Sequence, residues 1–209
     1  MSWAYWAPKS TTRTGFFIPE SYLGHDGWVN TYIGFLRGIN LGPARRVAMA
    51  DLRAWLTELG YADVRTHLQS GNAVFRSADS VAQVTRALEK GIEEAAGFPV
   101  DCVVRTPAQL RRVVEAHPFP DLATDNARMG VAFLAAPLGK DRLADVDPAA
   151  LEPERFAIGP GRAEIYLWYA NGMARSKLAA MVLPDRRLGV SPTVRNWNTV
   201  TKLLELSGG

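Results

Sequence analysis

The sequence predicts an α+β protein in which a regular first half is followed by a second, less regular α+β half. Between residues 31 and 105, short runs of strand-forming residues alternate with stretches whose apolar residues recur every three or four positions. Glycine and proline separate these segments. Hydrophobic residues make up 47% of the 209-residue chain, which is enough for a core in one large domain or two small ones.

The first half reads as strand, helix, strand, strand, helix, strand. The predicted strands cover residues 31–37, 64–69, 72–77 and 99–105. The first helix is predicted from apolar residues at helical spacing before Gly60, namely Met49, Leu52, Leu56 and Leu59. The second follows a cap at Asp79 or Ser80 and carries Val81, Val84, Leu88 and Ile92 on one face. This β-α-β-β-α-β order predicts a ferredoxin-like unit over residues 31–105.

Residues 106–209 are predicted to form a second α+β unit packed on the first. Thr106 and Gln109 form a capping box with proline at the first helical position, which opens a helix that ends near His117. A strand is predicted at 131–136, and a hairpin around Gly159-Pro160-Gly161.

Two more helices are predicted towards the C-terminus. One lies near 175–183, before Pro184, and the other has Ser191-Pro192 as its candidate cap and first turn. Asn196 or Asn198 is an alternative cap, and we expect Trp197 to be a core residue on the apolar face of that helix. No internal repeat is evident.

Residues 1–30 differ from the rest because they carry seven aromatic residues without periodicity. They contain no apolar stretch typical of a signal peptide. We interpret them as an extension outside the core, and the alternative is an arm whose aromatic side chains dock onto the body or onto a partner.

Composition excludes several classes of protein. No run of 18 apolar residues is present, so we expect no membrane span. Cys102 is the only cysteine, which rules out a disulfide within the chain, and the three histidines have no ligand spacing with it. We therefore expect no metal, no cofactor and a cytoplasmic location.

Positive charge is concentrated in the last quarter of the chain. Residues 155–209 hold eight basic and three acidic residues, a net charge of +5. Such asymmetry favours an anionic partner, and the alternative is a solvated surface with no ligand.

The predicted topology brings two polar segments to one edge of the first sheet. The first and second strands run in the same direction and the third returns, so the end of the first strand meets the turn between the second and third. The expected ligand-binding residues at this edge are Arg37, Asn40, Gln69, Ser70 and Asn72. Alternatively, both segments are simply a loop and a tight turn.

A second set of candidate residues opens the last two predicted helices. Helix N-termini with nearby basic side chains suit anions, although ordinary caps with solvated charges would have the same composition. The candidates are Arg175, Ser176, Lys177, Arg195, Asn198 and Lys202.

No catalytic residue can be assigned. The sequence contains no phosphate-binding glycine loop, no metal-protease motif and no nucleophile elbow. Cys102 lies within an apolar strand, which indicates an inert buried thiol. The candidate side chains bind and orient ligands but are poor acids and bases near neutral pH.

Four segments in order resemble the domain-of-unknown-function family 1697: FLRGINLG, MADLRAWLTELGYADVRTHLQSGNAVF, NGMARSKL and TVRNWNTVTKL. The resemblance runs from about Thr31 to Leu206. It implies an α+β protein of ferredoxin-like character that starts after residue 30, and it implies no activity. The loop after Gly42 departs from the family because PARRVAM replaces an expected lysine-containing stretch.

The leading functional hypothesis is a protein that binds a phosphate-bearing ligand, either a nucleotide or a nucleic acid, in a polar and basic cleft. The alternatives are a small-molecule enzyme that uses the same cleft to hold its substrate, and a structural or partner-binding protein. The sequence does not indicate the oligomeric state.

Overall fold

The structure, a computed structural model, describes residues 29–122 and 125–208. The predicted aromatic arm therefore lies outside the described residues, apart from its last two positions. The first half contains β1 (Asn30–Leu36), α1 (Met49–Glu58), β2 (Ala62–His67), β3 (Asn72–Ser77), α2 (Val81–Ala96), β4 (Cys102–Arg105) and α3 (Pro107–Glu115). The second half contains β5 (Met129–Leu134), β6 (Arg155–Ile158), β7 (Glu164–Trp168), α4 (Leu178–Met181), α5 (Asp185–Leu188), β8 (Pro192–Asn196) and α6 (Trp197–Leu206).

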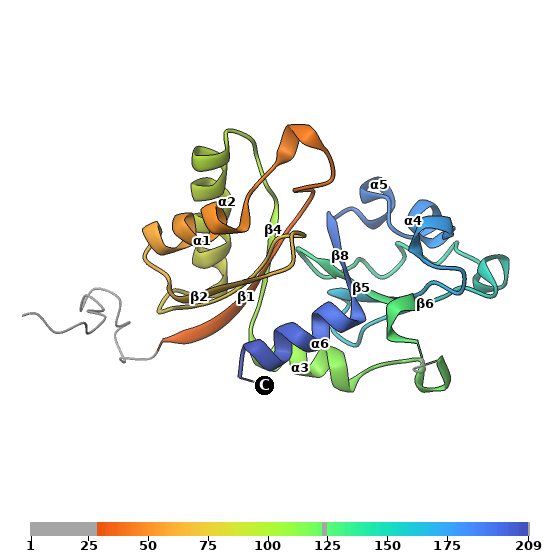
Figure 1. The fold of residues 1–209 in the computed structure, drawn as a ribbon. Coiled ribbons are helices and arrows are strands. Elements are labelled where there is room, and N and C mark those ends of the chain that lie inside the picture. Colours follow the sequence, from red (N-terminus) through yellow and green to blue (C-terminus); the bar gives the residue numbers. More distant parts are fainter. Residues whose placement is uncertain (1–28, 123–124, 209) are drawn as a thin grey trace, which may run out of the picture.

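The first sheet confirms the predicted ferredoxin-like order. Its four strands are antiparallel neighbours in the order β2-β3-β1-β4, and α1 and α2 cover one face (Figure 1). Leu36 N donates to Gly71 O at 2.8 Å, so the end of β1 meets the β2–β3 turn as expected. The second strand begins at Ala62, two residues earlier than the sequence pattern predicts.

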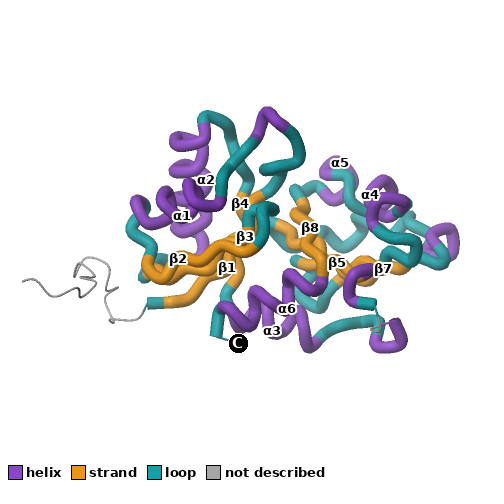
Figure 2. Tube along the Cα trace, viewed as in Figure 1, coloured by secondary structure: helices purple, strands orange, loops and turns teal. Residues whose placement is uncertain are grey.

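The second sheet repeats the topology of the first. Its order is β6-β7-β5-β8, which is the same second-third-first-fourth arrangement within its own half. The fourth strand of each half also leads directly into a helix, α3 after β4 and α6 after β8. The halves differ in their connections, because short 3-10 and α-helical turns in the second half replace the longer α1 and α2 (Figure 2).

This repeat corrects the sequence interpretation, and a faint trace of it is present in the chain. Val104-Arg105-Thr106 ends β4 and caps α3, while Val194-Arg195-Asn196 ends β8 and caps α6. Phe-Leu likewise ends both β1 and β5. These matches are too short to stand out without the strand order that aligns them.

The predicted start of the last helix at Ser191-Pro192 is wrong. Residues Pro192–Asn196 form β8 and pair with β5 over its length, and α6 begins at Trp197 with Asn196 as its cap. The pairing partner lies about sixty positions away in sequence, so local pattern does not reveal it. The helix predicted near 175–183 is also shorter, since only Leu178–Met181 is α-helical after a 3-10 turn, η6 (Met173–Arg175).

The core has three layers. Two of them lie on the outer faces of the sheets, the first under α1 and α2 and the second under α4, α5 and η5 (Pro148–Leu151). The central layer joins both sheets to α3 and α6, which lie side by side (Figure 1). Phe35 and Phe133 stack at its centre with ring centroids 4.3 Å apart, and Trp197 is buried there as predicted.

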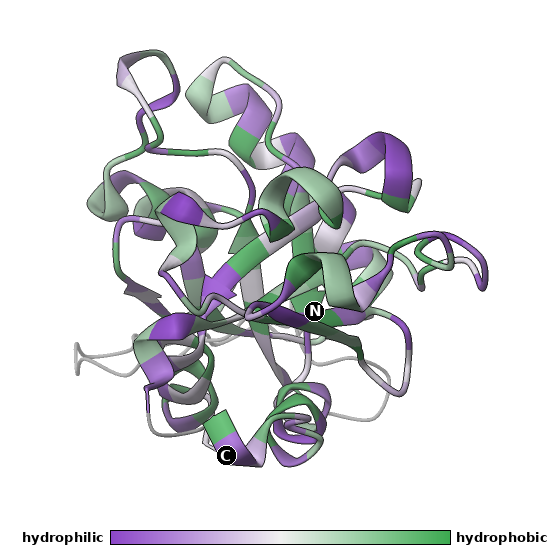
Figure 3. Ribbon diagram, turned by 90° about the vertical axis from the view of Figure 1, so that its right-hand side faces the viewer, coloured by the Kyte–Doolittle hydropathy of each residue, from purple (hydrophilic) through white to green (hydrophobic). Residues whose placement is uncertain are grey.

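Helix ends and faces follow the local sequence. Both predicted capping boxes form, Ser80 with Gln83 on α2 and Thr106 with Gln109 on α3. The longer helices carry both hydrophobic and hydrophilic residues (Figure 3). On α2 the buried residues Val84, Leu88 and Ile92 recur every four positions, so one side of this helix faces the core.

Gly71 is required at the β2–β3 turn for two reasons. Its φ of +75° is unfavourable for residues with a Cβ, and a Cβ there would lie 2.7 Å from Ile39 Cδ1 and 2.8 Å from Leu36 Cβ. We predict that Gly71→Ala lowers the free energy of unfolding by about 2–3 kcal/mol.

The matched control is Gly97→Ala at the end of α2. Gly97 has nearly the same φ, +78°, but no atom lies within 4 Å of the place that a Cβ would take, so only the backbone cost of about 1 kcal/mol applies. Urea denaturation of both variants measures the difference, and equal losses would contradict the close packing at Gly71.

Candidate functional site

Two buried arginines cross between the halves of the protein. Arg195 of β8 reaches the first half, where it donates to Leu36 O at 2.7 Å and to the Asn72 Oδ1 oxygen. Arg105 of β4 reaches the second half, where it donates to Leu134 O at 2.8 Å and to Glu164 Oε1 at 3.0 Å. Both arginines are less than a tenth exposed.

The two sets of contacts are equivalent in position. Each arginine meets the last residue of the other half's first strand and the first residue of its third strand. The second-last residue of that first strand is a phenylalanine, and each guanidinium carbon lies near its ring. The distance to the ring centroid is 5.6 Å from Arg195 to Phe35 and 5.9 Å from Arg105 to Phe133. Reciprocal contacts of this kind are those of a two-fold interface, here within one chain.

The equivalence breaks at one position. Arg105 meets a carboxylate in Glu164, with which it forms a buried ion pair, whereas Arg195 meets the neutral amide of Asn72. The other acceptors of Arg195 are also neutral: Ser70 O at 2.9 Å, Gly71 O at 3.3 Å, Thr193 Oγ1 at 2.8 Å and Val194 O at 2.9 Å. Among the described residues, Arg195 therefore has no carboxylate partner.

The charge of Arg195 persists at neutral pH. Burial lowers the pKa of its guanidinium to about 10, which still leaves the group protonated. Its five N–H groups are all engaged by protein oxygens. Arg195 thus supplies positive potential from the floor of the interface but has no donor left for a ligand.

A cleft of about 820 Å³ opens next to Arg195. The first half contributes the loop after β1, from Leu36 to Ile39, together with Leu41, Arg45, Ser70, Pro99 and Asp101. The second half contributes residues 192–195 of β8. The cleft therefore lies between the two halves, and three guanidinium groups line it: Arg37, Arg45 and Arg195.

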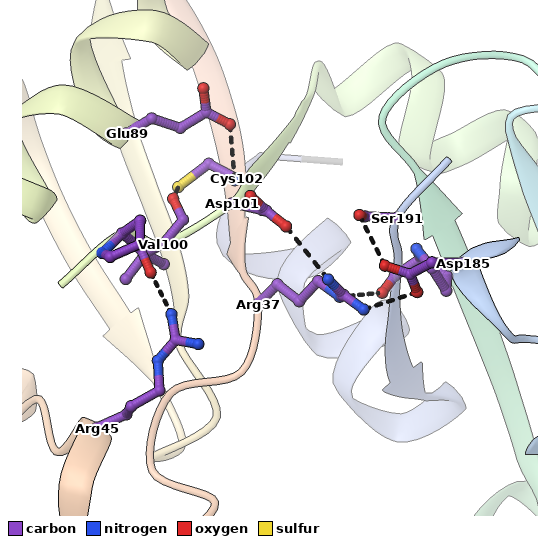
Figure 4. Close-up of polar contacts among 10 residues, drawn as sticks. Arg37, Arg45, Glu89, Val100, Asp101, Cys102, Asp185 and Ser191 are labelled. Atoms are coloured by element: carbon purple, nitrogen blue, oxygen red, sulfur yellow. Dashed lines mark hydrogen bonds and ion pairs between the residues drawn. The ribbon is translucent and has the colours of Figure 1, made fainter. Parts of the chain in front are cut away.

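Arg37 bridges the two halves across this cleft (Figure 4). Its Nη1 donates to Asp101 Oδ2 at 3.2 Å in the first half, and its Nη2 donates to Asp185 Oδ1 at 2.8 Å in the second. Its Nε donates to Pro192 O at 3.1 Å. These three bonds leave two of its five N–H groups without a partner among the described residues.

Arg45 lies at the rim of the cleft, on the 3-10 turn η2 (Pro43–Arg45). Its Nη2 donates to Pro99 O, and its guanidinium lies 5.0 Å from the centre of the Phe98 ring. The remaining N–H groups have no partner in the part of the chain that the structure describes, so Arg45 is the cleft arginine with the most unused donors. The sequence did not single out this residue.

The amides predicted for the site have mainly structural roles. Asn40, at a φ of +57°, accepts from Val47 N and donates to Val47 O, both at 2.9 Å, and donates to Gln69 O at 2.7 Å. Asn72 is fully buried and donates to His67 O at 2.8 Å and Ser70 Oγ at 3.0 Å. The bond from Asn40 to Gln69 O ties the loop after β1 to the β2–β3 turn. The Gln69 side chain itself has no hydrogen bond among the described residues.

Five other predicted residues do not line the cleft. Ser176 Oγ accepts from Leu178 N at 3.0 Å, and Lys177 N donates to Glu154 at 2.9 Å, next to α4 on the outer side of the second sheet. Lys202 pairs with Glu205 at 2.8 Å on α6. Arg175 is the last residue of η6, before α4, and Asn198 lies in the first turn of α6. Of the predicted ligand-binding residues, only Arg37, Ser70 and Arg195 line this cleft.

The buried thiol of Cys102 is unsuited to catalysis. It is 2% exposed, and burial, followed by the nearby Glu89 carboxylate, raises its pKa above the ordinary value. Within residues 29–122 and 125–208, no three histidine, cysteine or acidic side chains are grouped to hold a metal ion. In the same ranges, every helix is too short or too polar to traverse a bilayer.

A family model agrees with the family resemblance. The family model described as protein of unknown function (DUF1697) matches residues 29–166. The chain is also similar to a solved structure, the conserved bacterial protein SP0830 from Streptococcus pneumoniae, at 26% identity and a TM-score of 0.69. That match covers 87% of this chain and 100% of the other. No curated protein matches the sequence.

We predict that Arg195→Lys lowers the free energy of unfolding by about 3 kcal/mol although it keeps the charge. One ammonium group has three donors and cannot reach acceptors on β1, β3 and β8 together, so buried oxygens lose their partners. Arg86→Lys on exposed α2 is the control and should change stability by less than about 0.5 kcal/mol. Chemical denaturation measures the free energy of unfolding of both variants. A loss below about 1 kcal/mol for Arg195→Lys would contradict the conclusion that the guanidinium stabilises the fold by reaching several acceptors at once.

Proposed function

This chain belongs to the protein family DUF1697, and we propose that it binds a phosphate-bearing ligand in the cleft between its two halves. The observation that carries the proposal is the unneutralised guanidinium of Arg195 on the cleft floor. The corresponding arginine of the other half, Arg105, is neutralised by Glu164. The surroundings of Arg195 therefore have an excess positive charge that those of Arg105 lack. A low-dielectric protein wall strengthens the attraction of this charge for anions.

The rim of the cleft supplies the donors that Arg195 lacks. Arg37 and Arg45 both line the cleft and both retain N–H groups without a protein partner among the described residues. Guanidinium groups bind phosphate oxygens through charge-assisted, often bidentate hydrogen bonds. Asp101 and Asp185 pair with Arg37, so the balance of three cations and two carboxylates remains positive.

A compact ligand such as a nucleotide fits this arrangement better than an extended nucleic acid. Binding along a nucleic-acid backbone needs a track of available cations. In the basic last quarter of the chain, Arg155 pairs with Asp121, Arg187 with Asp145 and Lys202 with Glu205. Three of the eight basic residues that suggested a nucleic acid are thus paired within the protein, whereas the cleft brings the guanidinium groups of Arg37, Arg45 and Arg195 together.

The enzymatic alternative receives no support from a specific group. Asp101 is the only carboxylate that lines the cleft among the described residues, and it accepts from Arg37. An acid or base for catalysis would need to be within reach of a bound substrate. The cytoplasmic location also remains a prediction.

We predict that pyrophosphate binds the wild-type protein at low ionic strength and that Arg45→Gln weakens this binding about tenfold or more. The change removes charge-assisted hydrogen bonds, each of which contributes about 1.5–3 kcal/mol. Isothermal titration calorimetry gives the dissociation constant. Added salt should weaken binding because the cleft rim is solvent-accessible.

The control is Arg86→Gln, which makes the same change of charge on α2 at an exposed position outside the cleft. This variant should bind pyrophosphate like the wild type. Absence of wild-type binding at low ionic strength, or equal losses for the two variants, would refute the proposal.

A further inference from the structure

The loop after β1 exposes an apolar side chain to solvent at the edge of the cleft. Leu41 is 87% exposed, the highest value among the large hydrophobic residues of the described chain. Hydrogen bonds fix the loop next to Leu41, because the Asn40 side chain bonds to the backbone of Val47 and to Gln69 O. Leu41 is therefore held outward by a fixed neighbour.

Leu41 separates two adjoining hollows. One is the basic cleft of about 820 Å³, and the other is a hollow of about 520 Å³ lined by later residues of the same loop and by Gln69. Leu41 lines both. A ligand that extends from one hollow into the other must pass this side chain and would cover it.

The second hollow has a different chemistry from the basic cleft. Its apolar wall comes from Leu41, Pro43 and Val47. Its polar groups are the guanidinium of Arg46 and the side-chain amide of Gln69, both exposed and both without a side-chain hydrogen bond among the described residues. An apolar wall, a guanidinium plane and an amide with both donor and acceptor suit a flat heteroaromatic ring with polar edges.

We infer that the ligand is a nucleotide, with its phosphates in the basic cleft at Arg37 and Arg45 and its base against Leu41 in the second hollow. This inference rests on the proposed function and specifies the class of ligand. The Gln69 amide faces the edge of the base, and Arg46 lies over or beside its ring. The apolar contact of Leu41 contributes affinity mainly for ligands that carry a base, because pyrophosphate has no apolar surface.

The experiment compares pyrophosphate with ADP, GDP, CDP and UDP by isothermal titration calorimetry. At least one nucleoside diphosphate should bind about tenfold or more tightly than pyrophosphate. Leu41→Ser should weaken that nucleotide about fivefold to tenfold, because the covered leucine loses its apolar contact, and should weaken pyrophosphate by less than about twofold, because pyrophosphate has no apolar surface for Leu41 to cover.

Leu68→Ser is the matched control, since Leu68 is the second most exposed leucine, at 57%, and lines neither hollow. It should bind both ligands like the wild type. If pyrophosphate binds but no nucleotide binds more tightly, or if Leu41→Ser affects both ligands equally, the nucleotide inference is wrong and the phosphate cleft stands. If neither pyrophosphate nor any nucleotide binds, the phosphate cleft itself is refuted.

Discussion

The pair of crossed arginines is the interaction on which the arrangement of the two halves depends. Arg105 and Arg195 each leave the fourth strand of one half and bond to the ends of the first and third strands of the other. A buried cation costs free energy unless several acceptors surround it, so these bonds hold only in one relative placement of the sheets. The stacked rings of Phe35 and Phe133 lie between them and fill the centre of the interface.

A single difference between the halves separates a structural contact from a candidate site. Where the second half presents the Glu164 carboxylate to Arg105, the first half presents the Asn72 amide to Arg195. Both residues accept a hydrogen bond, so the geometry is the same in the two halves while the charge is not. The uncompensated charge lies under the loop that carries Arg37 and Arg45, which is why the basic cleft forms on that side.

The sequence alone predicted much of the first half and less of the second. Periodicity identified α1 and α2, and the meeting of the end of β1 with the Ser70-Gly71 turn followed from strand order. Strand β8 was missed because Pro192 and Asn196 both fit a helix start, and only pairing with β5 decides otherwise. Asn72 and Arg195 were both predicted as ligand contacts, whereas in the structure they are hydrogen-bonded to each other within the core.

What the sequence by itself determined is local: helical faces, capping boxes, turns and the α+β class, since these depend on residues within a few positions of each other. Only the tertiary structure decided which charges are neutralised. Arg37 meets Asp185 and Arg195 meets Asn72 across more than a hundred positions, and an electrostatic site depends on such distant partners. The repeat of topology became visible for the same reason, because strand order is a property of pairing and not of any single segment.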